Sequence, residues 1–587
     1  MSAFFRTFVA VLAALFVFCF LLLAGLALML ESEELVPPVA HKSLLTVDLS
    51  RPIVDRPPRE GLAEALDDAL SGEGRPPYTL RELVTAIDRA AADERISGLF
   101  LKGQVARQGY RSGWAALREL RQAIARFRAA GKPVISWHRS LDEATLYLVA
   151  GADRIQIHPL GLVEFNGLAA EVLYLREALD RYGVGVQAVR LGEYKSAVEP
   201  FLSRKMSEEN REQLAALLAD QQEELIEAVA RDRRRPPSAL RRLMEQEALL
   251  TAEAAHRAGL VTHVGHYDQV LERLRTITDT DAGRPIERQL DAARYFNTLE
   301  PSSGDAVAVI YVEGTLVADA RELQQVDGER IARLLRKARR DEEVKAVVLR
   351  INSPGGDAIA ADLIQREAER LAEEKPLVVS LGTVAASGGY WIATAGREIW
   401  VQPNTITGSI GVFGLFFNLQ EIAEEHGVHR EVVRTAAMAD FGSLLRPKTD
   451  AELARVRILV ERVYRDFLAK VARARDLSLD RVEALARGRI WSGRRALALG
   501  LADRAGGLHE ALASAAEKAG LGATFRVREY QRAEGLAERL LRALGVESDE
   551  GEARGPAHTL REELQRVFSA LQRQGVLARL PFDLTVY

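Results

Sequence analysis

The sequence predicts an α/β protein built from two tandem repeats with parallel sheets, preceded by one transmembrane helix. Three observations predict this class. A long uncharged segment lies near the N-terminus, and several segments of the second half of the chain repeat segments of the first half. Within each half, short apolar runs alternate with segments whose apolar residues recur at helical spacing. Such strand–helix alternation is typical of parallel sheets covered by helices.

The first expected element is a membrane anchor. Residues 7–30 contain 24 residues and no charge, and a helix of that length is about 36 Å long, enough to cross a bilayer core of about 30 Å. Arg6 precedes this segment and an acidic cluster at residues 31–34 follows it, which predicts a cytoplasmic N-terminus and a body on the outer side. A cleaved signal sequence is the alternative, but no small-residue cleavage site follows the apolar segment.

Internal similarity predicts how the rest of the chain is divided. Four pairs of segments, offset by 248, 243, 242 and 241 residues, read alike in chain order: 91–102 with 339–350, 131–150 with 374–393, 204–231 with 446–473, and 251–261 with 492–502. A slowly drifting offset over four segments indicates two related domains. We therefore expect five parts: an anchor at 1–35, a first repeat at 40–275, a linker at 276–305, a second repeat at 306–530 and a C-terminal extension at 531–587.

The second half shows the alternation clearly. Apolar runs of strand length occupy residues 306–314, 346–352, 376–381 and 398–403. Helical patterns occupy residues 329–341 and 358–374 between the first three of these runs. Functional sites of parallel α/β folds gather at the carboxyl ends of the strands, so the residues that follow these runs are the first candidates.

Composition argues against several functions. The net charge is −4 and the basic residues are dispersed, which does not favour a nucleic-acid partner. Cys19 is the only cysteine, and neither of the two close histidine pairs has the glutamate of a zinc-binding H-E-x-x-H helix. We expect no metal and no cofactor.

Two strand ends of the second half carry catalytic signals. The run "LRINSPGGDA" (349–358) leads through a Ser-Pro-Gly-Gly turn into a helix, where free backbone N–H groups could stabilise an oxyanion. Ser387 follows the next strand and a small-residue turn, within "TVAASGGYWIATAG" (383–396). Together these ends outline a nucleophile and an oxyanion hole, although no base lies near Ser387 in the sequence.

The other repeat offers the missing base. Ser387 aligns with Ala144 in the first repeat, while Lys195 aligns with Ala437 in the second. Each repeat therefore has one member of a Ser–Lys pair, which is a known alternative to the serine triad. The lysine must be neutral to accept a proton, which burial favours, whereas the nearby Glu193 and Glu199 would oppose it if they pointed inward.

Four motifs carry a family resemblance over nearly the whole chain: "INSPGG", "ASGGYWI", "TGSIG" and "YKSAVEPF". With the anchor and the duplication, they resemble the long form of the signal peptide peptidase A (protease IV) family, whose fold is similar to Clp protease and crotonase subunits. The resemblance implies that Ser387 is the nucleophile, Lys195 the general base and Ser409 a hydrogen-bond partner of that lysine. It also implies an oxyanion hole at Gly356 and Gly388.

The same resemblance implies a location and a substrate. We expect a bacterial inner-membrane homotetramer with its body on the periplasmic side, which cleaves apolar signal-peptide remnants. Two alternatives remain: a crotonase-like CoA enzyme, which would use carboxylates rather than Ser387, and a non-catalytic envelope scaffold.

Overall fold

The computed structural model describes residues 39–56, 76–106, 113–281, 286, 288–300, 304–318, 325–522 and 525–531, together with Val17 and the backbone of 576–579 and 585–586. The predicted anchor, residues 7–30, lies outside these residues except for Val17. No helix in the described ranges is both long enough and apolar enough to cross a membrane.

The first repeat is built on a parallel six-stranded sheet. Its strand order is β11 (His263–Val264), β6 (Arg154–Ile157), β5 (Val134–His138), β4 (Ile96–Lys102), β1 (Ser43–Asp48) and β12 (Gln289–Asp291). Its principal helices are α3 (Leu80–Ala92), α4 (Trp114–Ala129), α5 (Glu143–Val149), α8 (Glu208–Arg233), α9 (Pro237–Gln246), α10 (Ala252–Ala258), α11 (Tyr267–Thr278) and α12 (Ala292–Asn297). Nearly continuous apolar strands such as Leu99–Leu101 are buried, as expected for a sheet covered on both faces.

The second repeat has a corresponding sheet. Its strands follow the order β22 (Ile490–Ser492), β20 (Ile406–Gly408), β18 (Leu377–Ala386), β16 (Val344–Ser353), β13 (Ala306–Glu313) and β24 (Arg526–Glu529), while β19 (Glu398–Val401) joins β18 to β23 (Arg504–Ala505). All of these pairs are parallel except β20–β22. Its helices in the described residues are α13 (Gly328–Arg340), α14 (Ala358–Ala372), α15 (Gly388–Ala393), α16 (Gln420–Glu425), α17 (Asp450–Arg475), α18 (Leu479–Leu485), α19 (Gly493–Ala498) and α20 (Leu508–Lys518).

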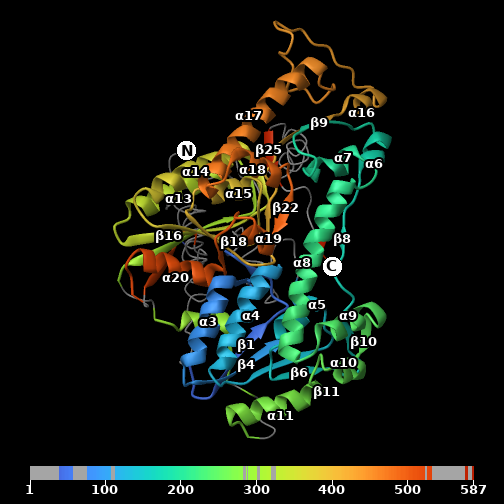
Figure 1. The fold of residues 1–587 in the computed structure, drawn as a ribbon. Coiled ribbons are helices and arrows are strands. Elements are labelled where there is room, and N and C mark those ends of the chain that lie inside the picture. Colours follow the sequence, from blue (N-terminus) through green and yellow to red (C-terminus); the bar gives the residue numbers. More distant parts are fainter. Residues whose placement is uncertain are drawn as a thin grey trace, which may run out of the picture.

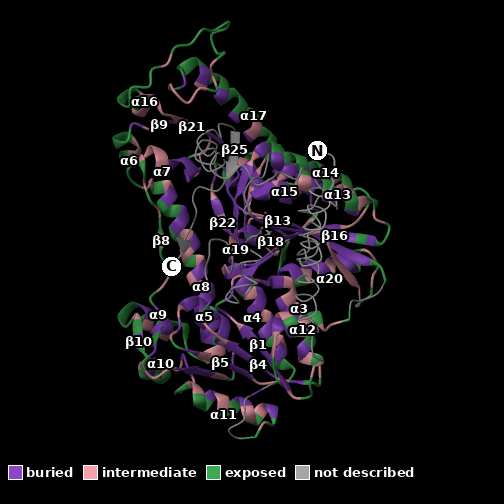
Figure 2. Cartoon of the chain, turned by 180° about the vertical axis from the view of Figure 1, so that it is seen from behind, coloured by how far each residue is buried: buried purple, intermediate pink, exposed green. Residues whose placement is uncertain are grey.

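The predicted α/β class with two parallel-sheet repeats is confirmed by this arrangement. Figure 1 shows the two bodies stacked, the first in the lower half of the view and the second above it, with α8 extending upward beside the second. The sheets are almost wholly buried in both bodies, whereas the outer helices expose one face (Figure 2). The N-termini of α13 and α14 are capped by Asp327 and Asp357, whose side chains accept from backbone N–H groups of the first turn.

A third sheet joins the two repeats. Its order is β15 (Gln325–Asp327), β14 (Thr315–Val317), β17 (Gly355–Asp357), β25 (Val576–Arg579), β21 (Phe413–Asn418) and β9 (Gly185–Arg190). The last strand belongs to the first repeat, and it pairs antiparallel with β21 over its whole length, from Gly185 opposite Asn418 to Arg190 opposite Phe413. The first repeat thus places the segment after Arg190 directly against the second repeat.

The predicted linker, residues 276–305, is more ordered than a simple connection. Strand β12 pairs parallel with β1 and α12 packs beside it, so these elements complete the first body. The buried side chains of Ala292 and Tyr295 explain why this segment folds against the sheet. β24 pairs with β13 in the same way in the second body.

Candidate active site

Ser387 lies at the junction of a buried strand and a helix. Every residue of β18 is buried, and the strand continues through Ala386, so the small residues before Ser387 belong to the strand rather than to the expected turn. Ser387 itself has φ 55° and ψ −117°, a conformation that costs about 1–3 kcal/mol in a residue with a side chain. Its N–H donates to the carbonyl of Gly408 at 2.8 Å, and its own carbonyl accepts from Trp391 N–H at 2.8 Å. These bonds hold the side chain at the start of α15.

Lys195 reaches Ser387 from the other repeat. It follows β9 and precedes a short 3₁₀ helix, Ser196–Val198. Its Nζ lies 2.7 Å from Oγ of Ser387, and 3.0 Å from both the hydroxyl and the carbonyl oxygen of Ser409. All three side chains are fully buried. The structure therefore brings together the three polar side chains that the sequence predicts for the site.

The surroundings of Lys195 favour a neutral amine. Burial alone lowers the pKa of its ammonium group well below the ordinary value. The two neighbouring carboxylates do not counteract this, because Glu193 pairs with Arg487 at 3.0 Å and Glu199 accepts from the hydroxyl of Ser207 at 2.6 Å. A neutral Nζ has two hydrogens, which the two Ser409 oxygens can accept. This arrangement would leave its lone pair to accept the hydroxyl hydrogen of Ser387.

Glycines allow the lysine loop to lie directly on the second repeat. Gly192 has φ +92° and Gly488 has φ +81°. A Cβ on Gly488 would lie 2.5 Å from Cβ of Lys195, and a Cβ on Gly192 would lie 2.3 Å from the carbonyl of Arg487. Such distances leave room only for glycine. The sequence analysis missed both residues, since a glycine in a loop does not by itself reveal which distant backbone it meets.

A buried glutamine holds the same loop from the opposite side. Gln213 of α8 donates to the carbonyl of Tyr194 at 3.1 Å and to Oγ of Ser196 at 2.9 Å. Its side-chain oxygen accepts from the N–H of Ile490 at 3.1 Å, which lies in the second repeat. Gln213 therefore positions the residues on both sides of Lys195, and it too was missed, because helix α8 shows no distinct polar motif.

The two candidate oxyanion glycines occupy neighbouring positions in the fold. Gly356 lies in β17 with φ +151°, and a Cβ there would come within 2.1 Å of the carbonyl oxygen of Leu316. Gly388 is the first residue of α15, where backbone N–H groups have no partner within the helix. The next residue packs closely on the Ser-Pro-Gly-Gly turn, since a Cβ on Gly389 would lie 2.7 Å from the carbonyl of Ser353. The start of α15, which follows Ser387, therefore packs on the turn that leads into β17.

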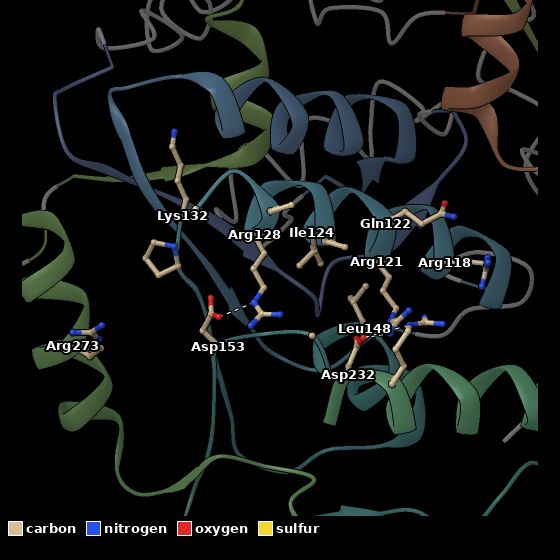
Figure 3. A pocket seen from close by; sticks show the side chains of 16 residues that line it. Arg118, Arg121, Gln122, Ile124, Arg128, Lys132, Leu148, Asp153, Asp232 and Arg273 are labelled. Atoms are coloured by element: carbon tan, nitrogen blue, oxygen red, sulfur yellow. Dashed lines mark hydrogen bonds and ion pairs between the residues drawn. The ribbon is translucent and has the colours of Figure 1, made fainter. Parts of the chain in front are cut away.

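The counterparts of the two catalytic candidates have no such surroundings. Ala144 is a buried residue of α5 and has no hydroxyl group, while Ala437 lies exposed in a loop. A separate cavity of about 810 Å³ opens in the first repeat, lined by α4 and the end of α8 (Figure 3). Its lining includes five arginines, among them Arg128, which pairs with Asp153 at 2.7 Å. None of its lining residues belongs to the Ser387 site.

Comparison with known proteins defines the class. Residues 126–281 and 369–522 each match the family model described as Peptidase family S49, and the two matches begin 243 residues apart, as the internal similarity predicts. The chain belongs to this family and is a serine protease. It is similar to Protease 4 of Haemophilus influenzae, with 37% identity over 73% of this chain and 71% of that protein. It is also similar to Protease 4 of Salmonella typhi, with 31% identity over 86% and 83%. With the chloroplastic serine protease SPPA of Arabidopsis thaliana it shares 29% identity over 78% and 68%.

Proposed function

We propose that this protein is a membrane-anchored endopeptidase that degrades cleaved signal peptides through a dyad of Ser387 and Lys195. The observation that supports it best is the 2.7 Å contact between Nζ and Oγ in a fully buried site. The distance suits proton transfer, and burial, which lowers the pKa of Lys195, favours the neutral amine that this transfer requires.

The mechanism follows from the contacts. Neutral Lys195 takes the proton of Ser387, and Oγ attacks the carbonyl carbon of the scissile peptide bond. The N–H groups of Gly356 and Gly388 stabilise the oxyanion. The ammonium group of Lys195 then donates its proton to the leaving amine. Lys195 next activates the water that hydrolyses the acyl-enzyme, while Ser409 keeps Nζ oriented throughout.

Substrate and location rest on the anchor and on the family resemblance. An apolar helix at residues 7–30 would hold the body at the periplasmic side of a bacterial inner membrane, where cleaved signal peptides remain. The resemblance to signal peptide peptidase A further suggests a homotetramer. A duplicated chain would contribute one complete dyad per subunit to such an assembly.

Cleavage of an apolar fluorogenic peptide by the full chain in detergent tests the dyad. Ser387→Ala and Lys195→Ala should each lower kcat roughly 10³-fold or more. Lys205→Ala is the matched control, because this lysine lies in the same repeat and is exposed, and it should keep full activity. If Lys195→Ala remains active while Ser387→Ala does not, the base lies elsewhere. If the unmutated chain cleaves no peptide, the scaffold alternative gains support.

A further inference from the structure

The cavity of about 810 Å³ in the first repeat carries an excess of positive charge. Its volume is within the range of pockets that hold small organic ligands. Two carboxylates line it, Asp153 and Asp232, together with six cationic side chains: Arg118, Arg121, Arg128, Lys132, Arg231 and Arg273. The cavity therefore has the charge of a site for an anion.

One side of α4 forms the arginine wall of this cavity. Arg121, Ala125 and Arg128 recur at intervals of three and four residues, which places them on the same side of the helix. Arg118 begins the same row one turn earlier. Because Ala125 contributes only a methyl group, the arginines border a hollow rather than filling it. The end of α8 and helix α11 form the opposite side (Figure 3).

The carboxylates at this cavity are already paired with arginines of α4. Asp232 accepts from Arg121, and Asp153 accepts from Nε of Arg128 at 2.7 Å. Arg118 pairs with a glutamate of α8 that does not line the cavity. The three arginines of the helix therefore use the nearby carboxylates, and further cations of the lining must find another anion.

Two arginines on the opposite side have no carboxylate of their own. Arg231 is 3.8 Å from Asp232, which already accepts from Arg121, and its side chain is 65% exposed. Arg273 is exposed, and no hydrogen bond or ion pair joins it to another residue in the described part of the chain. By contrast, Lys132 points away from the arginines (Figure 3) and donates to two backbone carbonyls of the first repeat.

Like charges also act on the inner end of the cavity. Burial lowers the pKa of Arg118 below its ordinary value, and the neighbouring Arg121 and Arg231 add to this lowering. A negative group between these side chains would relieve the repulsion.

We propose that this cavity binds a phosphate-bearing anion, with Arg231 and Arg273 as its ion-pair partners. The planar fork of a guanidinium group matches two oxygens of one phosphate. The cavity has room for more than a single phosphate ion, and its lining also includes the apolar Ile124 and Leu148, which suit an organic part. Soluble phosphate esters and the headgroups of acidic phospholipids share this chemistry.

Isothermal titration calorimetry of the full chain in a non-ionic detergent, with pyrophosphate as the probe, tests this site. Arg231→Gln and Arg273→Gln should each weaken binding about tenfold or more, because each removes a charge-assisted hydrogen bond. Both side chains are exposed, so neither replacement disturbs the core. Arg211→Gln is the matched control: it removes the same charge from an exposed position of α8, about 30 Å along the helix from Arg231. It should bind as tightly as the unmutated chain.

A second titration, with dihexanoyl phosphatidic acid below its micelle concentration, separates the two sources of phosphate. Tighter binding of pyrophosphate would indicate a soluble ligand, and tighter binding of the lipid a membrane headgroup. Absence of binding for both probes would overturn the proposal, as would equal affinity of the Arg231→Gln, Arg273→Gln and Arg211→Gln chains. Because no peptide is present, the result does not depend on the proposed function.

Discussion

Arg350 connects the two repeats through a buried ion cluster, and replacing it with methionine should lower the thermal stability of the chain. Its guanidinium group, from β16 of the second repeat, donates from Nε to Asp55 at 2.9 Å and from Nη2 to Glu119 of α4 at 2.8 Å. A third bond reaches the hydroxyl of Ser380 at 2.9 Å. The arginine and both carboxylates are buried. Arg350→Met would leave two buried carboxylates without their cation.

The magnitude follows from this burial. Removing one partner of a buried ion pair costs roughly 3–5 kcal/mol, and each kcal/mol lowers the melting temperature of a domain of this size by about 2–4 °C. We therefore expect a drop of about 6–20 °C at pH 8. Burial raises the pKa of Glu119 above its ordinary value even beside Arg350. Arg350 itself lowers this pKa, so its removal should raise the pKa of Glu119 further. A carboxyl with a raised pKa stabilises the fold at low pH and loses this contribution as pH rises through its folded pKa. The drop should therefore be smaller at pH 5.

Thermal unfolding by circular dichroism, with peptidase activity measured in parallel, is the assay. Arg176→Met is the matched control, because its pair with Asp180 is a partly exposed i,i+4 pair that contributes less than about 0.5 kcal/mol. Adding Glu119→Gln to Arg350→Met should recover part of the loss. A melting temperature within about 2 °C of the unmutated chain at pH 8 would refute the reasoning.

Four further predictions concern the site itself. kcat/KM should rise with pH through an apparent pKa well below that of a free lysine, because burial lowers the pKa of Lys195. A pH–rate profile that rises only near pH 10 would contradict this lowered pKa. Lys195→Arg should abolish activity at every pH, since a guanidinium group stays charged. Gly356→Ala should lower kcat roughly 10²-fold in the same peptide assay, because its Cβ would displace the strand beside Leu316; unchanged kcat would exclude Gly356 from the oxyanion hole. Ser409→Ala should lower kcat about tenfold and move the pH–rate profile to lower pH, since the ammonium form of Lys195 loses an acceptor; a profile that keeps its position would exclude this role. Finally, a mixture of Ser387→Ala and Lys195→Ala chains should stay inactive, because the contact forms within one chain, whereas recovered activity would show that chains exchange the lysine.

Much of this architecture could be predicted because the two repeats keep similar sequences at a nearly constant offset along the chain. The strands and helices of the second half begin and end within a few residues of the expected positions, since continuous apolar strands and capped amphipathic helices are local signals. The pairing of Ser387 with Lys195 is not local, but the alanines at the two aligned positions, Ala144 and Ala437, pointed to it. A comparison between repeats thus located a contact between residues 192 positions apart.

Other features depend on tertiary contacts that no local pattern encodes. Gly192 and Gly488 are needed because the loop of Lys195 and the loop of Arg487 approach each other closely. The sequence of neither loop shows which distant loop it will contact. Strand β12 lies in a stretch that reads as a polar linker, although its neighbour β1 gives it a place in the sheet. Strand β25 has four residues, too few to show a periodic pattern in the sequence. Its position depends on its pairing with β17 and β21.

The composite site has an electrostatic reason as well as a geometric one. Lys195 is buried because loops of the second repeat cover it: Gly488 lies against its backbone, and a Cβ on Gly411 would lie 3.2 Å from its side-chain Cδ. No carboxylate compensates for this desolvation, so the interface itself lowers the pKa of the lysine. Separated from the second repeat, Lys195 would return to water and carry a proton at neutral pH. The contact between repeats therefore lowers the pKa of Lys195 and also places its amine on Ser387. Under the proposed mechanism, any change that loosens the interface should lower activity before it unfolds either repeat.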